Sequence, residues 1–364
     1  MRRKTRKVKV GNIFIGGDAP VSVQGMAKVR TSDVKKLLKD AARMVKEGAE
    51  LVRVSVLDED DAAVLPIIRH AAGVPVVADI HYSHKLALLA VEKGADKIRI
   101  NPGNMSREGV RETVSAAKDS GIPIRIGVNS GSVRMGKNLA ESMVASALNA
   151  VELFESMNFR SIVVSLKTPL VYDTLNCYRR ISALCGYPLH LGITEAGRGT
   201  LAESKSVLGI GMLLSEGIGD TIRVSLTEPA WKEIKAGRAI LQALGVRRFE
   251  PEIISCPTCG RTQVDLFAVL AKVEKEIKKL HKRHPEAKDM KFAVMGCGVN
   301  GPGEARQADI GIAGGAGKFA LFKKGVIIGT YREEAIVEKL ITATEEMLKN
   351  PICSSLRTNV KQSR

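Results

Sequence analysis

The sequence predicts an α/β protein in which a (β/α)8 barrel is followed by a small α+β domain. A short apolar strand followed by a helical stretch occurs eight times in the first part of the chain, as a (β/α)8 barrel requires. The repeat stops at a linker between Gly245 and Ser255 that contains Pro251. An open doubly wound sheet is the alternative, but eight strands at fairly even spacing favour the closed barrel.

Eight apolar segments are the predicted barrel strands. They are Val21–Ala27, Leu51–Leu57, Pro75–His81, Lys97–Gly103, Pro123–Asn129, Ser161–Lys167, Leu189–Gly197 and Asp220–Thr227. Before them, Lys7–Val10 and Ile13–Ile15 flank Gly11-Asn12 and predict a hairpin that plugs the bottom of the barrel. Start signals such as Thr31-Ser-Asp33 and stops such as Lys46-Glu-Gly48 bound the intervening helices.

The remaining chain predicts a separate domain with mixed helices and strands. We expect a barrel domain over 1–247, a second domain over 248–350 and a basic tail over 351–364. The predicted elements of the second domain are helices at about Gln263–His281 and Glu333–Leu348, and strands Lys291–Met295, Asp309–Ala313, Phe319–Lys323 and Val326–Tyr331. Gly314–Lys318 fails the Walker spacing and is interpreted as a glycine hairpin.

Composition favours a reducing compartment and an anionic partner. Lys and Arg exceed Asp and Glu by 56 to 39, which gives a net charge of +17. The surplus is spread along the chain and aromatic residues are only 4%, so nucleic acid is not expected as the main ligand. An anionic small molecule or an acidic redox protein fits better. No apolar run has transmembrane length, the basic start lacks the apolar stretch of a signal peptide, and six cysteines fit the cytoplasm.

Charged residues at the carboxyl ends of the predicted strands indicate the site. Chemistry in such barrels lies at these ends, and a charge within an apolar strand is costly unless it faces the open mouth. Five cations with one Asp and one Glu there would form a positive cup for a di- or polyphosphate, with carboxylates left for proton transfer or hydroxyl binding. The residues at these strand ends are Arg53, Asp79, His81, Arg99, Asn101, Arg125, Asn129, Lys167, Glu195, Arg223 and Ser225.

Three cysteines and one glutamate in the second domain indicate a metal site. Cys256 and Cys259 form a CxxC turn, and Cys297 lies in a glycine-rich loop that also contains Glu304. Three thiolates favour an iron–sulfur cluster or zinc, and Glu304 is the best nearby fourth ligand. A thiol–disulfide pair remains an alternative. Cys177, Cys185 and Cys353 lack ligand spacing and are interpreted as packed or surface thiols.

With these motifs in view, the sequence resembles the bacterial 4-hydroxy-3-methylbut-2-enyl diphosphate synthase family over nearly its whole length. The resemblance rests on segments of both predicted domains. Among them are Val77-Ala-Asp-Ile-His81, Lys97-Ile-Arg-Ile-Asn-Pro-Gly-Asn104, Gly219-Asp-Thr-Ile-Arg-Val-Ser-Leu226, Ser255-Cys-Pro-Thr-Cys-Gly-Arg-Thr262 and Gly298-Val-Asn-Gly-Pro-Gly-Glu-Ala305.

The resemblance implies a barrel joined to a domain like those of sulfite and nitrite reductases, with a [4Fe–4S] cluster held by Cys256, Cys259, Cys297 and Glu304. It implies a two-electron reductive ring opening of 2-C-methyl-D-erythritol 2,4-cyclodiphosphate in isoprenoid precursor biosynthesis. Flavodoxin or ferredoxin would be the electron donor, and a homodimer would share each active site between protomers.

The resemblance also assigns roles to the residues at the strand ends. It implies substrate contacts at Arg53, Arg99, Arg125, Asn129, Lys167, Arg223 and Ser225. It implies polar or acid–base roles at Asp79, His81 and Glu195, and a role for Glu304 at the cluster.

The chain departs from the family pattern in two places. Where the family usually has Ser-Met-Thr-Asn-Thr after Gln24, this chain has Gly25-Met-Ala-Lys-Val-Arg-Thr31, and Lys28 or Arg30 could replace hydroxyl contacts there. Val133–Lys137 also differs from the usual sequence. The rival interpretations are a phosphate- or pterin-binding barrel enzyme with a zinc-stabilised domain, and a metal-stabilised RNA-binding protein.

Overall fold

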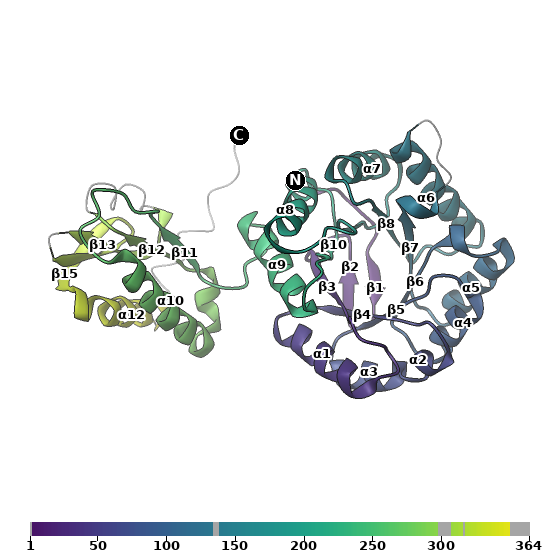
Figure 1. Cartoon of the computed structure of the whole chain (residues 1–364), viewed down its shortest axis with the longest axis horizontal. Coiled ribbons are helices and arrows are strands. Elements are labelled where there is room, and N and C mark those ends of the chain that lie inside the picture. The colour runs from purple at the N-terminus through teal and green to yellow at the C-terminus, as the bar shows by residue number, and fades with distance from the viewer. Residues whose placement is uncertain (1, 134–137, 298–306, 316, 350–364) are drawn as a thin grey trace. The chain divides into compact units, whose positions relative to one another are not determined.

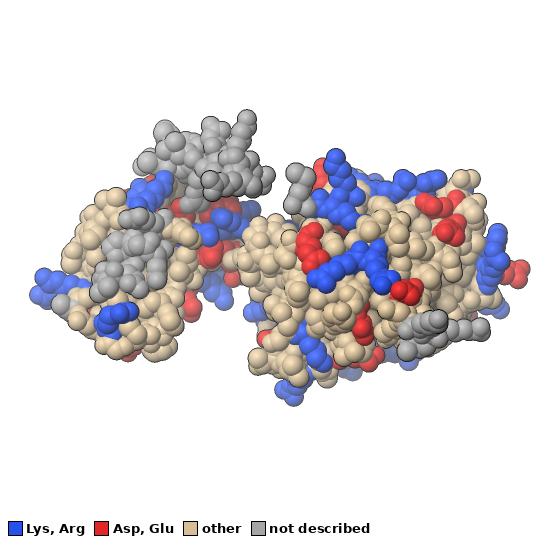
Figure 2. Space-filling model, turned by 90° about the horizontal axis from the view of Figure 1, so that it is seen from above, with Lys and Arg blue, Asp and Glu red and all other residues tan. Residues whose placement is uncertain are grey.

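A computed structural model describes residues 2–133, 138–297, 307–315 and 317–349. The chain divides into two compact units, Met1–Arg247 and Arg248–Arg364. None of the described helices is long and apolar enough to cross a membrane. In the face shown in Figure 2, Lys and Arg side chains are interspersed with Asp and Glu over both units rather than gathered in one patch.

The first unit is the predicted (β/α)8 barrel, and Figure 1 shows its helices around the ring of strands. The strands follow the order β8-β7-β6-β5-β4-β3-β10-β9, and a parallel bridge from Val164 to Leu189 links β8 to the segment before β9. They are β3 (Ser22–Met26), β4 (Leu51–Ser55), β5 (Val76–Asp79), β6 (Lys97–Ile100), β7 (Ile124–Asn129), β8 (Ile162–Lys167), β9 (His190–Leu191) and β10 (Thr221–Ile222).

The helices of the barrel begin and end near the predicted signals. Asp33 accepts a hydrogen bond from the backbone N–H of Lys36 at the start of α1, and Gly48 after that helix has φ +99°, a backbone conformation that glycine adopts without a Cβ clash. The helices are α1 (Val34–Lys46), α2 (Glu59–Ala63), α3 (Leu65–Ala72), α4 (His84–Glu92), α5 (Arg107–Asp119), α6 (Leu139–Ser156), α7 (Val171–Leu184), α8 (Gly199–Ser215) and α9 (Ala230–Ala243).

The predicted plug is confirmed. Strands β1 (Val8–Val10) and β2 (Ile13–Ile15) form an antiparallel hairpin. Its apolar side chains pack in one buried cluster with Leu51, Val77 and Val163, which face into the barrel from β4, β5 and β8. This end of the barrel is therefore closed by apolar packing.

The same end of the barrel has a repeated arrangement of acidic residues. Glu50, Asp96 and Asp220 each directly precede a strand and accept the backbone N–H of Val23, Val76 and Leu189 respectively, at 3.0, 2.9 and 2.8 Å. Each carboxylate also pairs with an arginine: Arg247 at 2.7 Å, Arg69 at 3.0 Å and Arg2 at 2.5 Å. These charges are thus paired within the fold.

The second unit is an α+β domain with the sheet order β11-β12-β13-β14-β15. Its elements are β11 (Glu252–Ser255), α10 (Leu266–Arg283), a 3-10 turn (Pro285–Asp289), β12 (Lys291–Met295), β13 (Ile310–Gly315), β14 (Lys318–Lys323), β15 (Val326–Arg332) and α12 (Glu333–Lys349). One apolar cluster joins α10, α12 and the sheet, and includes Val273, Phe292, Phe319 and Leu340.

Two expectations about boundaries need correction. The stretch Gly245–Ser255 is not a linker throughout, because Glu252–Ser255 pairs in parallel with β12 as strand β11. The last two barrel strands are also shorter than predicted, since the pairing ends at Leu191 and Ile222. Glu195, Arg223 and Ser225 therefore lie in the segments that follow these strands.

Candidate active site

The strand register brings the predicted charges of the barrel together. Asp79 on β5 lies opposite Arg99 on β6, which lies opposite Arg125 on β7. Further along β7, Asn129 lies opposite Lys167 on β8. Because side chains alternate along a strand, residues opposite one another at these positions share the inner face of the barrel.

Asp79 is the carboxylate that several of these charged side chains contact. It is buried, and its oxygens lie 3.2 Å from Arg99 Nη1, 3.2 Å from His81 Nε2 and 3.8 Å from Arg53 Nε. Burial by itself raises the pKa of Asp79, but Arg53, His81 and Arg99 outweigh it and hold that pKa well below 3.8. Asp79 is therefore ionised and acts as an acceptor.

The five cations Arg53, Arg99, Arg125, Lys167 and Arg223 form what we call the cationic cup. Burial, followed by the charges of neighbouring arginines, lowers the pKa of Lys167 and Arg125 well below their ordinary values. The same two effects lower the pKa of Arg223 to about 10, which leaves it charged at neutral pH. Nε of Arg99, Arg125 and Arg223 has no hydrogen-bond partner among the described residues. The cup thus has more positive charge and more donors than its own carboxylates satisfy.

Two glycines provide space for these long side chains. A Cβ on Gly127 would lie 2.4 Å from Arg99 Nε, and a Cβ on Gly192 would lie 2.9 Å from Lys167 Nζ and 2.5 Å from the carbonyl oxygen of Arg223. All three distances are shorter than van der Waals contact allows, so glycine at these two positions leaves room for the side chains of the cup.

A polar layer that the sequence analysis did not single out lies on the same inner face. Gln24, Lys97 and His190 are fully buried, and their side-chain nitrogens have no partner among the described residues. Burial and the charges of Arg125 and Arg53 lower the pKa of Lys97 well below 10.5. A signal existed for Lys97, because it lies two residues before Arg99 and must share its face.

Glu233, in the first turn of α9, is a second buried carboxylate that the sequence analysis missed. Its oxygens accept the backbone N–H of Leu226 at 2.8 Å and lie 2.7 Å from Lys28 Nζ and 3.4 Å from Arg223 Nη2. Arg30, the other cation of the divergent first loop, pairs with Asp58 and Asp61. Both cations thus bind carboxylates of the barrel itself, and direct contact of either with a ligand stays a prediction.

The remaining predicted residues lie around the mouth. His81 and Asn129 are partly buried, as is Ser225. Glu195 is exposed and has φ +54°, a left-handed conformation that is uncommon for a residue other than glycine. Glu195 thus lies at the surface, in the segment after β9.

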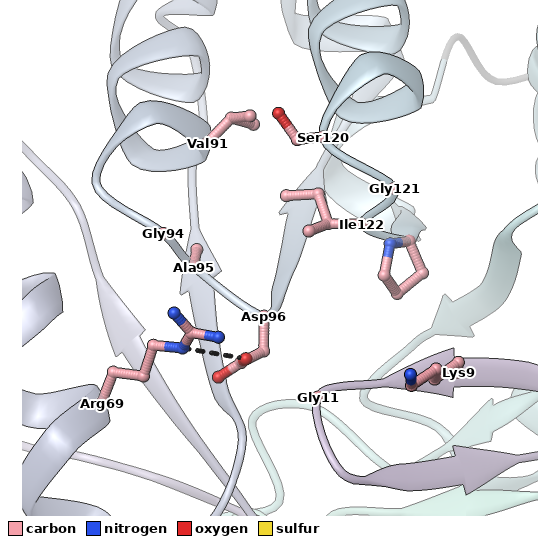
Figure 3. Close-up of a pocket in the computed structure, with 11 residues that line it drawn as sticks. Lys9, Gly11, Arg69, Val91, Gly94, Ala95, Asp96, Ser120, Gly121 and Ile122 are labelled. Carbon is pink, nitrogen blue, oxygen red and sulfur yellow. Dashed lines mark hydrogen bonds and ion pairs between the residues drawn. The ribbon is translucent and has the colours of Figure 1, made fainter.

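A pocket of about 290 Å³ lies at the opposite end of the barrel, where Lys9 and Gly11 of the hairpin face the ends of α4 and α5 (Figure 3). Its buried carboxylate, Asp96, is already paired with Arg69 and with a backbone N–H. The pocket lacks the surplus of buried cations found at the mouth, so we do not assign the active site to it.

The second unit brings two of the predicted ligands to one sheet edge. Cys256 and Cys297 follow β11 and β12, which pair in parallel with Ser255 opposite Val294, so both cysteines lie just beyond the same edge. The backbone N–H of Gly296 donates to Cys256 Sγ at 3.3 Å. Gly296 also packs closely against Thr262, since a Cβ there would lie 2.9 Å from Thr262 Cγ2.

The third predicted ligand, Cys259, is exposed. Hydrogen bonding from the backbone of Arg261, together with the charge of that arginine, lowers the pKa of the Cys259 thiol below 9.0. Within the described ranges, no three Cys, His, Asp or Glu side chains lie close enough to hold a metal ion. Glu304 falls outside the described residues. The donor set of soft thiolates, one of them with a lowered pKa, fits an iron–sulfur cluster or zinc.

The other cysteines behave as predicted where they are described. Cys177 is fully buried beside Met143, and burial raises the pKa of its thiol to about 12, so it is an unreactive packed residue. Cys185 is partly buried at the end of α7, and Cys353 falls outside the described residues.

Comparison with known families decides the classification. Residues 5–238 match the GcpE TIM-barrel domain, and residues 252–346 match the GcpE protein C-terminal domain. The chain belongs to the GcpE family. The two matches cover both units of the structure and confirm the predicted barrel.

Curated relatives in this GcpE group share about half of the residues. A protein of Ruminiclostridium cellulolyticum is 48% identical over 353 residues, covering 95% of this chain and 98% of its own. One of Clostridium perfringens is 49% identical over 354 residues, covering 94% and 99%. Both are named 4-hydroxy-3-methylbut-2-en-1-yl diphosphate synthase (flavodoxin).

Solved structures also resemble the barrel of this GcpE chain. Dihydropteroate synthase from Stenotrophomonas maltophilia matches with a TM-score of 0.52 at 16% identity, covering 66% of this chain and 98% of its own. At that identity the likeness shows the fold alone, and it does not support the pterin-binding alternative.

Proposed function

We propose that this GcpE-family enzyme is a 4-hydroxy-3-methylbut-2-en-1-yl diphosphate synthase. It reduces 2-C-methyl-D-erythritol 2,4-cyclodiphosphate by two electrons, opens the ring and releases water. The names of relatives at 48–49% identity over nearly the whole chain support the activity. The observation that carries the assignment in this chain is the surplus of buried cations at the barrel mouth, which matches an anionic diphosphate.

Different residues of the barrel bind the diphosphate and orient the rest of the substrate. The cationic cup binds the diphosphate through charge-assisted hydrogen bonds from donors that the protein leaves without partners. Asp79, ionised between Arg99 and His81, accepts a hydrogen bond from a substrate hydroxyl and holds both neighbours in place. His81, partly exposed and 3.2 Å from Asp79, would deliver a proton to the departing oxygen. Asn129 and Ser225 add neutral contacts at the rim, and Glu195 takes an acid–base role from the exposed loop after β9.

Cys256, Cys259, Cys297 and Glu304 would hold the [4Fe–4S] cluster. When bound there, the cluster would supply the electrons for the reduction, with flavodoxin or ferredoxin as the donor. Flavodoxin is the donor that the names of the relatives give. A carboxylate is a harder ligand than thiolate and is held less firmly by iron, so Glu304 would be the weakest of the four ligands.

An absorption spectrum separates this proposal from its rivals. Protein purified anaerobically should be brown with broad visible absorption and should contain iron. A colourless protein with stoichiometric zinc would favour the barrel enzyme with a zinc-stabilised domain, and a colourless protein that binds RNA would favour the RNA-binding alternative.

Two variants test the ligands. Cys297→Ser should lose the cluster, because it removes one of three thiolates. Glu304→Ala should keep much of its iron but lose most turnover. Iron content and activity are measured for both under anaerobic conditions. Full iron, wild-type oxygen tolerance and full activity in Glu304→Ala would mean that Glu304 is neither ligand nor catalytic residue.

Sharing of the site between two protomers of a cytoplasmic homodimer is part of the proposal. Mixing Arg99→Leu chains with Cys297→Ser chains should restore activity in some heterodimers, since one barrel and one cluster domain in each remain intact. Heterodimers that form but show no activity would point to a site built within one chain.

A further inference from the structure

The first and last loops of the barrel mouth are connected by Lys28. Its backbone N–H donates to Asp40 Oδ2 on α1 at 3.1 Å, so the start of the loop is anchored. Its side chain crosses to the segment after β10, where Nζ donates to the carbonyl oxygens of Leu226 and Glu228 and lies 2.7 Å from Glu233 Oε1. A single ammonium group therefore has three acceptors from one neighbouring segment, which uses the three donors it possesses.

Among the three acceptors of Lys28, Glu233 is the one that carries a charge. Its side chain is 1% exposed, and a buried carboxylate is stable only when paired. Oε1 has Lys28 at 2.7 Å and the Leu226 N–H at 2.8 Å, whereas Oε2 has Arg223 Nη2 at 3.4 Å. Lys28 is therefore the closer of the two cations that balance this carboxylate.

Arg223 belongs to the cationic cup, and whether it can bind a ligand depends on which cation neutralises Glu233. Its contact with Glu233 is long, and its Nε has no partner among the described residues. If Lys28 were absent, Glu233 would have Arg223 as its only charged partner in the described structure, and the guanidinium would be drawn toward α9 and away from the mouth. The charge of Arg223 would then be neutralised within the protein.

We propose that Lys28 is a positioning residue that neutralises Glu233, and so leaves Arg223 free to bind the diphosphate of the substrate. The inference rests on the proposed function, because it assigns Lys28 to the binding step of that reaction. In this role Lys28 acts through Glu233 and Arg223, and no contact of its own with the substrate is required.

The test is a double-mutant cycle on the holoenzyme, with the dissociation constant of the cyclodiphosphate measured by anaerobic calorimetry. Lys28→Met should weaken binding about tenfold, equivalent to about 1.4 kcal/mol. Lys28→Arg, which keeps the charge, should bind nearly as the wild type does. Lys28→Gln can still donate to the two carbonyl oxygens but lacks the charge, so it should resemble Lys28→Met. This variant keeps the test available if Lys28→Met does not fold.

The decisive comparison is made in a Glu233→Gln background. With the carboxylate gone, Lys28 has nothing to neutralise, so Lys28→Met/Glu233→Gln should bind as Glu233→Gln does. A merely structural role of Lys28 would lower the melting temperature but would leave its effect on affinity the same in both backgrounds. Wild-type affinity in Lys28→Met, or an undiminished loss in the Glu233→Gln background, would overturn the proposal.

Lys36→Met is the matched control for charge. Lys36 lies in the first turn of α1 and pairs with Asp33 at 2.7 Å. Its removal should leave affinity unchanged, and an equal loss in this variant would mean that positive charge near the mouth in general, rather than the neutralisation of Glu233, is responsible. A wild-type protein that fails to bind the cyclodiphosphate at all would instead contradict the proposed function.

Discussion

The charged residues at the two ends of the barrel differ in how completely they are paired. At the closed end, the buried carboxylates of Asp96 and Asp220 and the partly exposed carboxylate of Glu50 each pair with an arginine and accept a backbone N–H, and Asp220 also accepts the Thr5 hydroxyl. At the mouth, the cationic cup has five buried or largely buried cations, of which three have a side-chain nitrogen without a partner in the described structure.

The difference separates charges that stabilise the fold from charges that bind a ligand. A buried charge with complete pairing is a structural connection, and its removal should cost stability. A buried charge left without partners lowers stability until a ligand arrives, and its removal should cost affinity. The following predictions test this division, from the largest expected effect to the smallest.

The largest effect is expected from Asp220→Ala at the closed end. The change leaves Arg2 and the Leu189 N–H without their acceptor, so the free energy of unfolding should fall by about 3–5 kcal/mol. Substrate affinity of the folded protein should stay at the wild-type level. Thermal unfolding and calorimetry measure the two quantities. The exposed pair of Asp18 with Lys7 provides the control, since Asp18→Ala should leave stability nearly unchanged.

Arg99→Leu should have the reverse effect at the mouth. It removes a charge-assisted contact of about 1.5–3 kcal/mol, which corresponds to roughly 10- to 150-fold in the dissociation constant of the cyclodiphosphate. The iron content should be unchanged, because Arg99 lies in the barrel unit. Arg69→Leu, at the closed end, should leave affinity unaltered. If both arginines proved equivalent in binding, the division between the two ends would fail.

Lys97→Met should stabilise the protein by about 1 kcal/mol or more, because it replaces a buried amine without a partner by an apolar side chain. In the wild type the folded-state pKa of Lys97 lies below the unfolded value of 10.5, so the unfolded state binds more protons between the two values and stability rises with pH there. The variant should lack this rise. A lower melting temperature in Lys97→Met would mean that the amine has a partner in solution.

The smallest effect is expected in proton linkage. Burial and neighbouring cations lower the pKa of Lys167 in the free protein, and a bound dianion should raise it again. Between these two values, binding takes up a fraction of a proton and affinity decreases as pH rises. Calorimetry in buffers with different ionisation enthalpies measures the uptake, and Lys167→Met should reduce it. Equal binding enthalpies in all buffers would contradict the linkage.

The sequence was sufficient to predict the features that depend on strand alternation and strand ends. The barrel, its hairpin plug and the placement of Asp79, Arg99 and Arg125 on one face follow from periodicity and from the position of polar residues in apolar strands. Their assigned roles remain proposals.

The missed features have physical explanations. Glu233 lies on a helix and reaches the mouth only because α9 packs against the barrel, which strand periodicity does not indicate. Strand β11 has four residues at the edge of its sheet and follows Pro251, so its local signal was that of a linker. Glu195 was expected at the mouth with the other charged residues, and it lies exposed in the segment after β9.

Gly127 and Gly192 also have a genetic consequence. Every amino-acid replacement of a glycine adds a Cβ. At Gly127 that carbon would collide with Arg99, and at Gly192 it would collide with Lys167 and the backbone of Arg223. Replacements should therefore be rarest at Gly192, where the carbon meets a backbone oxygen, and at Gly127 they should displace the Arg99 guanidinium, which a cell that depends on this enzyme would also tolerate poorly. Saturation mutagenesis under such selection would recover glycine at 127 and 192, even though neither residue has a side chain to offer the substrate.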